Sequence, residues 1–235
     1  MDRGYSERLN LSRVATPCFV VDEAKVRSNL SILDRVRERT GCRILLALKA
    51  FGMFSLFPLI RRTLQGVCAS SPHEARLGRE EFNGEVHTFA AGYNESNVRE
   101  LIELTDHLIF NSFSQWKRFR EQVTKSGRHI RCGIRVNPEH SEAAVALYDP
   151  CAPLSRLGVR HEDFTGQDLN GITGLHLHTL CEQNADALAR TLDVFEKKFG
   201  NWTLLQILYF GLWDKRYIFV VHFPENIYGR YPSSI

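Results

Sequence analysis

Apolar residues recur along the chain with two different periods. Residues 23–39 place an apolar side chain at every third or fourth position, which predicts a helix with one apolar face. Asp22 stands at the expected N-cap, and Gly41 ends the pattern. Residues 43–48, which follow, are almost all apolar, as is typical of a strand buried on both faces.

This strand–helix alternation repeats at steps of roughly twenty residues. Further strands are predicted at residues 66–70, 86–90, 107–110, 130–136 and 172–178. Helices are predicted at residues 55–64, from Pro72, at 95–104, from the cap Ser114 to about 123, and at 184–199. The alternation predicts a parallel α/β fold, and no G-x-G-x-x-G follows any strand. We therefore favour a (β/α)8 TIM-type barrel over an open doubly wound sheet.

Polar residues gather at the carboxyl ends of the predicted strands. They are Lys49, Ala69-Ser70-Ser71, Asn111 and Ser112, Arg135 and Asn137, and His176, His178 and Cys181. In a barrel these ends meet at one mouth, where functional residues lie. Lys49 ends an apolar strand, where desolvation would lower the pKa of its amine and make it a nucleophile, as a Schiff-base lysine requires. A lysine exposed at the strand end is the alternative.

Composition and charge narrow the class of protein. The 235 residues are 43% hydrophobic and 24% charged, as in an ordinary globular chain. The net charge of +3 comes from basic and acidic residues spread along the chain, which indicates no nucleic-acid partner. No apolar run is long enough to span a bilayer, so no membrane partner is predicted. The polar N-terminus lacks a signal-like apolar core, which predicts a cytoplasmic location.

The cysteines and histidines predict no metal site. The six cysteines are scattered without a C-x-x-C pair and are interpreted as reduced thiols. His176 and His178 are interpreted as pointing to opposite faces of their strand, so that they would not share one zinc ion.

Six segments closely resemble the carboxynorspermidine (carboxyspermidine) decarboxylase family. They are Thr16-Pro-Cys-Phe-Val-Val-Asp22, Leu45-Leu-Ala-Leu-Lys49-Ala-Phe51, Ala69-Ser-Ser-Pro-His-Glu-Ala75, Gly133-Ile-Arg-Val-Asn-Pro-Glu-His140, Tyr148-Asp-Pro-Cys-Ala-Pro-Leu-Ser-Arg-Leu-Gly158 and Gly174-Leu-His-Leu-His-Thr-Leu-Cys-Glu-Gln183. The resemblance covers roughly residues 14–199. These enzymes are alanine-racemase-like, fold-type III pyridoxal-phosphate enzymes, which implies a barrel followed by a β domain.

The resemblance implies roles for the residues at the mouth. Lys49 would hold pyridoxal 5'-phosphate through its amine and later serve as an acid and base. His178 would stack on the pyridine ring, while His176, interpreted as facing the other way, would be structural. Arg135 would lie below the cofactor and support its electronics.

Further roles follow from the same resemblance. Cys181 would lie near the cofactor phosphate, and Ser70 and Glu74 would support the cofactor from a second layer. The family acts on a polyamine-like substrate, so Glu139 and Asp149 in the long loop are candidates to attract its amines.

The chain departs from the family's pattern after about Gly200. The family continues with a glycine-rich phosphate loop and a β domain, whereas residues 201–235 are rich in aromatic residues, as a truncated or frameshifted gene end would be. Residues 204–210 still have the pattern of a strand. We predict an N-terminal segment at 1–21, with a strand that in the family pairs with the β domain, and a cofactor-binding barrel at 22–200. The aromatic-rich tail follows it.

The predicted function is pyridoxal-phosphate-dependent decarboxylation of carboxynorspermidine or carboxyspermidine in polyamine biosynthesis. We expect little turnover from this chain, because it lacks a recognisable phosphate loop. The family forms homodimers, and without the β domain we expect aggregation rather than an ordered dimer. Two alternatives stay open: a barrel that carries pyridoxal phosphate without turnover, and a cofactor-free fragment that associates with partners through an exposed barrel edge.

Overall fold

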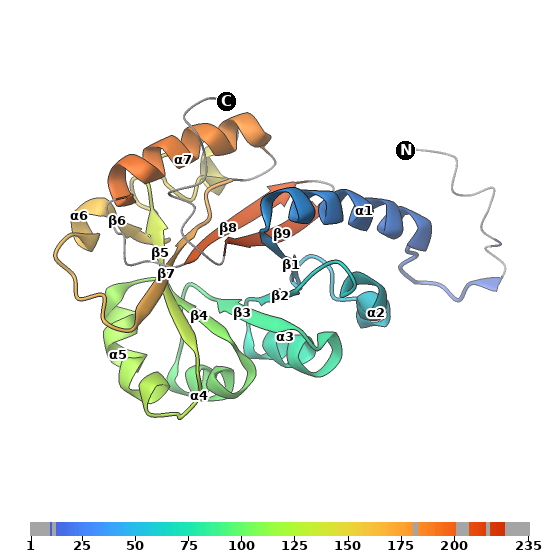
Figure 1. Cartoon of the computed structure of the whole chain (residues 1–235), viewed down its shortest axis with the longest axis horizontal. Helices are drawn as coiled ribbons and strands as arrows, with labels where there is room; N and C mark the ends of the chain where they lie inside the picture. Colours follow the sequence, from blue (N-terminus) through green and yellow to red (C-terminus); the bar gives the residue numbers. More distant parts are fainter. Residues whose placement is uncertain (1–9, 11–12, 181–182, 201–206, 215–216, 224–235) are drawn as a thin grey trace.

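The computed structural model describes residues 10, 13–180, 183–200, 207–214 and 217–223 as a curled sheet with helices on its outer side (Figure 1). The strands are β1 (Arg43–Ala47), β2 (Gly66–Ala69), β3 (Glu85–Phe89), β4 (His107–Phe110), β5 (Arg131–Asn137), β6 (Val159–Arg160), β7 (Ile172–Leu177), β8 (Ile207–Asp214) and β9 (Tyr217–Phe223). The helices are α1 (Glu23–Thr40), α2 (Phe57–Ile60), α3 (Pro72–Leu77), α4 (Glu95–Leu104), α5 (Phe113–Thr124), α6 (His161–Phe164) and α7 (Ala185–Phe199). The predicted alternation of strands and helices is confirmed.

The backbone ladders run around a complete circuit. From β1 to β5, and on to β7 and β8, each strand pairs in parallel with the next, while the short β6 pairs with β5 at its end. β9 then runs antiparallel and pairs with both β8 and β1. A TIM-type barrel is therefore present through β8, but an antiparallel strand stands in place of an eighth parallel unit. Because β9 covers the free side of β1, the exposed barrel edge that we expected is absent from the described strands.

Local sequence explains most of the helix boundaries. The Asp22 carboxylate accepts hydrogen bonds from the backbone amides of Ala24 and Lys25, so the predicted N-cap of α1 is confirmed. The predicted cap of α5 is wrong, because Ser112 rather than Ser114 caps that helix. Phe113 lies buried in the first turn, which starts the helix two residues earlier.

The main core lies between the sheet and its helices. The largest fully buried side chains include Phe57, Phe82, Phe110, Phe119, Phe164, Phe195 and Phe199. A smaller apolar layer faces the barrel interior, where Leu45 and Ile109 pack with Cys68 and Phe89. Polar side chains lie above and below this inner layer, so the barrel has a polar cluster at each end.

The N-terminal part of the described chain is irregular. Residues 16–21 form no strand, and Phe19 is 94% exposed. No strand is therefore present in the described residues of the predicted segment 1–21, most of whose first twelve residues lie outside the described part of the chain. No described helix has both the length and the apolar character needed to cross a membrane.

The side-chain amide of Asn111 holds the end of the loop between β5 and β7 against the barrel. Asn111, at the end of β4, donates from Nδ2 to the Arg156 carbonyl and accepts at Oδ1 from the Gly158 amide. Gly158 has a φ of +83°, and a Cβ added there would lie 2.8 Å from the carbonyl carbon of Val136. Only glycine meets both requirements, so this turn holds the loop against the mouth.

Gly158→Ala is expected to destabilise the fold more than Gly166→Ala. Gly166 has a similar φ of +78°, but a Cβ added there meets nothing within 4 Å. Gly166→Ala should therefore lower the free energy of unfolding only by the cost of a left-handed backbone, about 1–2 kcal/mol. Gly158→Ala should lower it by about 1–3 kcal/mol more, because the added methyl group overpacks the site. Urea unfolding of both variants measures the difference, and equal losses of stability would contradict the tight docking of the loop.

Candidate active site at the carboxyl ends of the strands

Lys49 lies just beyond the end of β1, in a turn. The amides of Ala50 and Phe51 both donate to the Ala47 carbonyl, which bends the chain as it leaves the strand. The Lys49 side chain is exposed rather than buried. The amine therefore lies at a solvent-exposed strand end and not in the dry end of a buried strand.

Arg135 is the buried cation of the site. It lies on β5 with only 5% of its surface exposed, and burial lowers the pKa of its guanidinium to about 10. Its Nη2 donates to the His178 carbonyl at 2.9 Å, and its guanidinium carbon lies 5.0 Å from the centre of the Phe89 ring. Arg135 is thus satisfied by a carbonyl and an aromatic face, which ties it to the chain at the end of β7.

The interpretation of His176 and His178 as facing opposite ways is wrong. Their ring centres lie 5.7 Å apart with an angle of 29° between the ring planes. Side chains alternate along a strand with a period of two, so residues two apart share a face. Both histidines therefore point into the barrel, His176 deeper and His178 nearer the mouth.

Phe89 joins these groups into one packed cluster. Its ring lies 5.0 Å from the His176 ring and 5.0 Å from the Arg135 guanidinium carbon. Burial lowers the pKa of His178 to about 3, and the charges of Arg135 and Lys49 add to the effect. The pKa of His176 is also lowered, chiefly by burial. Both imidazoles are neutral at pH 7. The Phe89 ring packs against the deeper of the two, His176.

Ser70 and Glu74 form a pair beside Lys49. The amide and hydroxyl of Ser70 donate to the Glu74 Oε2 at 2.6 and 2.9 Å. Burial raises the pKa of Cys68, on the adjoining β2, to about 12, while the charge of Lys49 opposes this and that of Glu74 adds to it. Cys68, Glu74 and Lys49 therefore lie within electrostatic reach of one another.

The two acidic candidates of the loop make separate contacts. Glu139 receives an ion pair from Lys198 of α7 at 2.8 Å, so its charge is already balanced. Asp149 accepts at Oδ1 from the Cys151 amide at 2.8 Å. Burial raises the pKa of the Cys151 thiol to about 11, while the charge of Arg135 opposes the shift. Asp149 thus holds the loop close to Arg135, whereas Glu139 faces α7.

Some site residues were not singled out from the sequence, and one predicted residue is not described. Phe89 was missed because alternation does not show which face of a barrel strand points inward. Cys151 stands inside the Asp-Pro-Cys-Ala segment of the family resemblance, which was the available signal. Cys181 lies outside the described residues.

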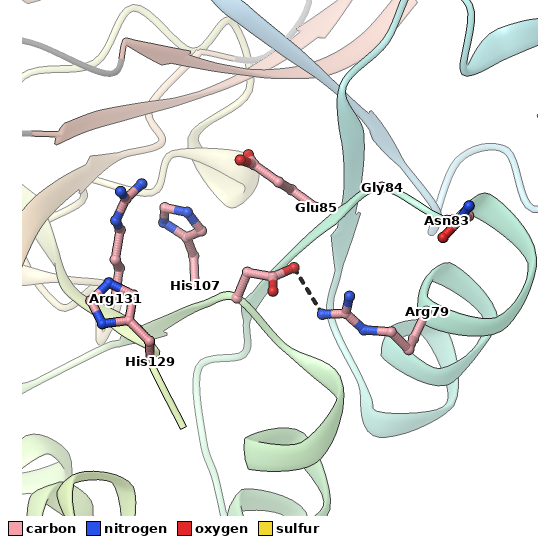
Figure 2. A pocket seen from close by; sticks show the side chains of 8 residues that line it. Arg79, Asn83, Gly84, Glu85, His107, His129 and Arg131 are labelled. Carbon is pink, nitrogen blue, oxygen red and sulfur yellow. Dashed lines mark hydrogen bonds and ion pairs between the residues drawn. The ribbon is translucent and has the colours of Figure 1, made fainter. Parts of the chain in front are cut away.

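The amino ends of the strands carry a hollow in the described surface of the barrel. A cavity of about 440 Å³ opens there, with Arg79 hydrogen-bonded to Asp106 at 2.8 Å across its wall (Figure 2). Its lining comprises Arg79, Asn83, Gly84, Glu85, Asp106, His107, His129 and Arg131. The amine, neutral imidazole and buried guanidinium converge at the other end, and barrel enzymes work at that end. We therefore place the candidate active site at the carboxyl ends.

Curated relatives share this chain's sequence over much of its length. No protein-family model matches the chain. It is 39% identical over 190 residues to carboxynorspermidine/carboxyspermidine decarboxylase of Campylobacter jejuni, covering 81% of this chain and 49% of the relative. It is 41% identical over 196 residues to carboxyaminopropylagmatine decarboxylase of Synechocystis sp., covering 83% of this chain and 50% of the relative.

Solved structures share the fold. Carboxynorspermidine decarboxylase of C. jejuni, complexed with norspermidine, superposes with a TM-score of 0.72 at 36% identity, over 81% of this chain and 48% of that one. Diaminopimelate decarboxylase of Helicobacter pylori, complexed with L-lysine, superposes with a TM-score of 0.69 at 16% identity, over 84% of this chain and 54% of that one. The second likeness shows the fold alone.

These comparisons confirm the family resemblance over a defined part of the relatives. The chain spans about half the length of the curated relatives that it matches. Within that half, sequence and fold agree, and the mouth of the barrel carries the lysine, arginine and histidine of the resembling segments. Over that half, the chain is similar in sequence and in fold to the carboxynorspermidine/carboxyspermidine decarboxylases.

Proposed function

We propose that this chain binds pyridoxal 5'-phosphate at the carboxyl-end mouth, with Lys49 as its covalent attachment point. The protein's reaction would be decarboxylation of a carboxylated polyamine such as carboxynorspermidine or carboxyspermidine. The observation that carries the proposal is the convergence of an exposed primary amine, a buried guanidinium and a neutral imidazole in segments shared with the decarboxylases.

The residues at the mouth have the chemistry that the cofactor requires. When bound, pyridoxal phosphate acts as an electron sink for the carbanion left when carbon dioxide departs. A primary amine is the group that condenses with its aldehyde, and Lys49 offers one on the exposed side of the mouth. Within the described part of the chain Lys49 forms no ion pair, so its amine is accessible.

His178 and Arg135 would orient the cofactor. A neutral imidazole stacks on a flat heteroaromatic ring without placing a second positive charge beside it. Burial keeps His178 neutral at pH 7, and Arg135 holds the backbone at that position through the His178 carbonyl. Ser70 and Glu74, bonded to each other beside Lys49, would support the cofactor from the side.

The described part of the chain offers no clear binding site for the cofactor phosphate. Gly211, which directly follows the strand predicted at residues 204–210, lies within β8 opposite Val220 of β9. Its backbone therefore belongs to a strand ladder rather than to a phosphate-binding loop. Each hydrogen bond to a charged phosphate contributes roughly 1.5–3 kcal/mol, so losing several weakens cofactor binding by orders of magnitude. We accordingly expect weak cofactor retention and little turnover.

A cationic substrate would meet carboxylates in the loop that follows β5. One related decarboxylase has been solved with norspermidine, which is a polyamine. Asp149 lies near the mouth through Cys151, and Glu139 lies on the same loop. We propose that both carboxylates attract the substrate amines, with Glu139 exchanging Lys198 for a substrate amine.

Cofactor carriage without turnover is the second candidate function, because it requires only the attachment lysine and the stacking ring. Two measurements separate the candidates. Absorbance of the bound cofactor reports attachment, and carbon dioxide released from carboxynorspermidine reports decarboxylation. Attachment with no release beyond that of the Lys49→Ala variant would favour the carrier.

Lys49→Ala is expected to abolish the borohydride-stable cofactor adduct. Reduction of the protein with excess pyridoxal phosphate, followed by peptide mass spectrometry, locates the modified lysine. Lys117→Ala is the matched control, since Lys117 is bonded to Gln167 on the outer side of the barrel. An adduct that persists in Lys49→Ala, or that maps to another lysine, would refute the assignment.

His178→Ala is expected to weaken cofactor affinity more than His176→Ala. Loss of a stacked ring costs roughly 0.5–1.5 kcal/mol, a few-fold to about tenfold in Kd. His176 lies deeper, between His178 and Phe89, and would act on the cofactor only through His178. Fluorescence titration with pyridoxal phosphate measures both affinities, and a larger effect at His176 would mean that it is the stacking ring.

Stability is expected to fall as the pH drops below about 6.5. The folded-state pKa of His178 is lowered to about 3 from 6.5, so in this window the unfolded chain binds more protons. The stability that the neutral, buried His178 contributes is fully present above pH 6.5 and is lost as the pH falls towards 3. His178→Gln should flatten the dependence by up to about 1.4 kcal/mol per pH unit. Urea unfolding from pH 7 to 4 tests this, with His73→Gln, at an exposed position, as control.

A further inference from the structure

Three potential metal ligands meet inside the barrel at its amino end. Glu85 and His87 are two apart on β3 and therefore share a face, and His107 on β4 is the direct cross-strand partner of His87. One ligand atom from each residue lies within 4.8 Å of the others. Both histidines are buried, with 2% exposure each. Two alternate residues of one strand and one neighbour on the next make a compact triangle of donors.

One of the three donor pairs already has the spacing of a metal shell. The Glu85 Oε2 lies 3.2 Å from the His87 Nε2, to which it is hydrogen-bonded. In a tetrahedral zinc shell with bonds of about 2.0–2.1 Å, neighbouring donors lie about 3.3 Å apart. The rings of His87 and His107 are stacked with centres 3.8 Å apart and planes 18° apart, so one ring must turn about its Cβ–Cγ bond to aim at a shared ion.

The carboxylate is already oriented by a second residue. Arg43 donates to the Glu85 Oε1, whereas Oε2 faces His87. Metal sites commonly hold a ligating carboxylate in this way, with an outer hydrogen bond that fixes its direction. Arg43 and Arg131 also add positive charge nearby, which selects against ions that rely on charge alone, such as Mg²⁺ and Ca²⁺.

The cluster has a route to solvent. Glu85 and His107 both line the cavity of about 440 Å³ at the amino end and point into it (Figure 2). A hydrated ion can enter there, and a water molecule can complete the shell as a fourth ligand.

We propose that Glu85, His87 and His107 form a binding site for one divalent transition-metal ion, with Zn²⁺ as the best match to a donor set of two imidazoles and one carboxylate. The site lies at the opposite end of the barrel from the candidate active site and shares no residue with it. The ion would join β3 to β4 and stabilise the amino end of the barrel, where residues serve stability rather than catalysis.

The test uses the full chain without a polyhistidine tag, reduced and freed of metal by a chelator. Titration with Co²⁺ should give one equivalent of visible d–d absorption and no thiolate-to-cobalt band in the near ultraviolet. X-ray absorption of the Zn²⁺-loaded chain should show nitrogen and oxygen scatterers only. Sulfur scatterers would place the ion at cysteines and overturn the proposal, as would failure to take up one ion per chain.

Variants assign the ligands. Glu85→Gln and His107→Gln should each weaken Zn²⁺ binding at least about tenfold and reduce the rise in Tm that Zn²⁺ produces. His129→Gln is the matched control, since His129 lines the same cavity but lies outside the cluster. Equal weakening in the control would show surface binding and overturn the assignment. The scattering measurement on the unaltered chain keeps the test decisive where a variant fails to fold.

Discussion

Alternation of side chains along the strands of a closed barrel is the constraint on which this structure depends. Every second residue of each strand points into a shared interior that is too small for unpartnered charges. Arg135 therefore rests on the Phe89 ring and the His178 carbonyl, and Glu85 faces Arg43 and His87. In both polar clusters, each buried charge is therefore held against a partner of suitable chemistry.

The layer between these clusters separates two kinds of chemistry. Leu45 and Ile109 form an apolar floor, with Phe89 packed against it. Above it lie groups that open towards the mouth, and below it lie groups that open towards the amino-end cavity. The separation is not electrically complete, since the charge state of His87 is among the influences on His176. The packed apolar layer keeps the two polar clusters out of contact, although their charges still influence each other.

Local patterns predicted the elements well and the contacts between them poorly. Residues 95–104 and 107–110 match their predicted helix and strand, because apolar periodicity reports directly on burial. Resemblance and strand ends together singled out Lys49, Arg135 and His178, and the structure places all three at the mouth. His87 beside His107 was not found, because cross-strand register depends on the whole barrel. The orientation of His176 could have been predicted correctly, because residues two apart on a strand point to the same face.

If Glu139 attracts a substrate amine as proposed, its ion pair with Lys198 would make this part of the loop act as an ion exchanger. A cationic ligand at Glu139 would replace one ammonium group with another, so the local charge would be the same before and after. Such an exchange depends on ionic strength less steeply than capture by a bare carboxylate, because no net charge is neutralised. The exchange would also break the contact between Lys198 of α7 and the loop. Binding of a cationic ligand at Glu139 would therefore loosen the attachment of α7 on the outer side of the barrel.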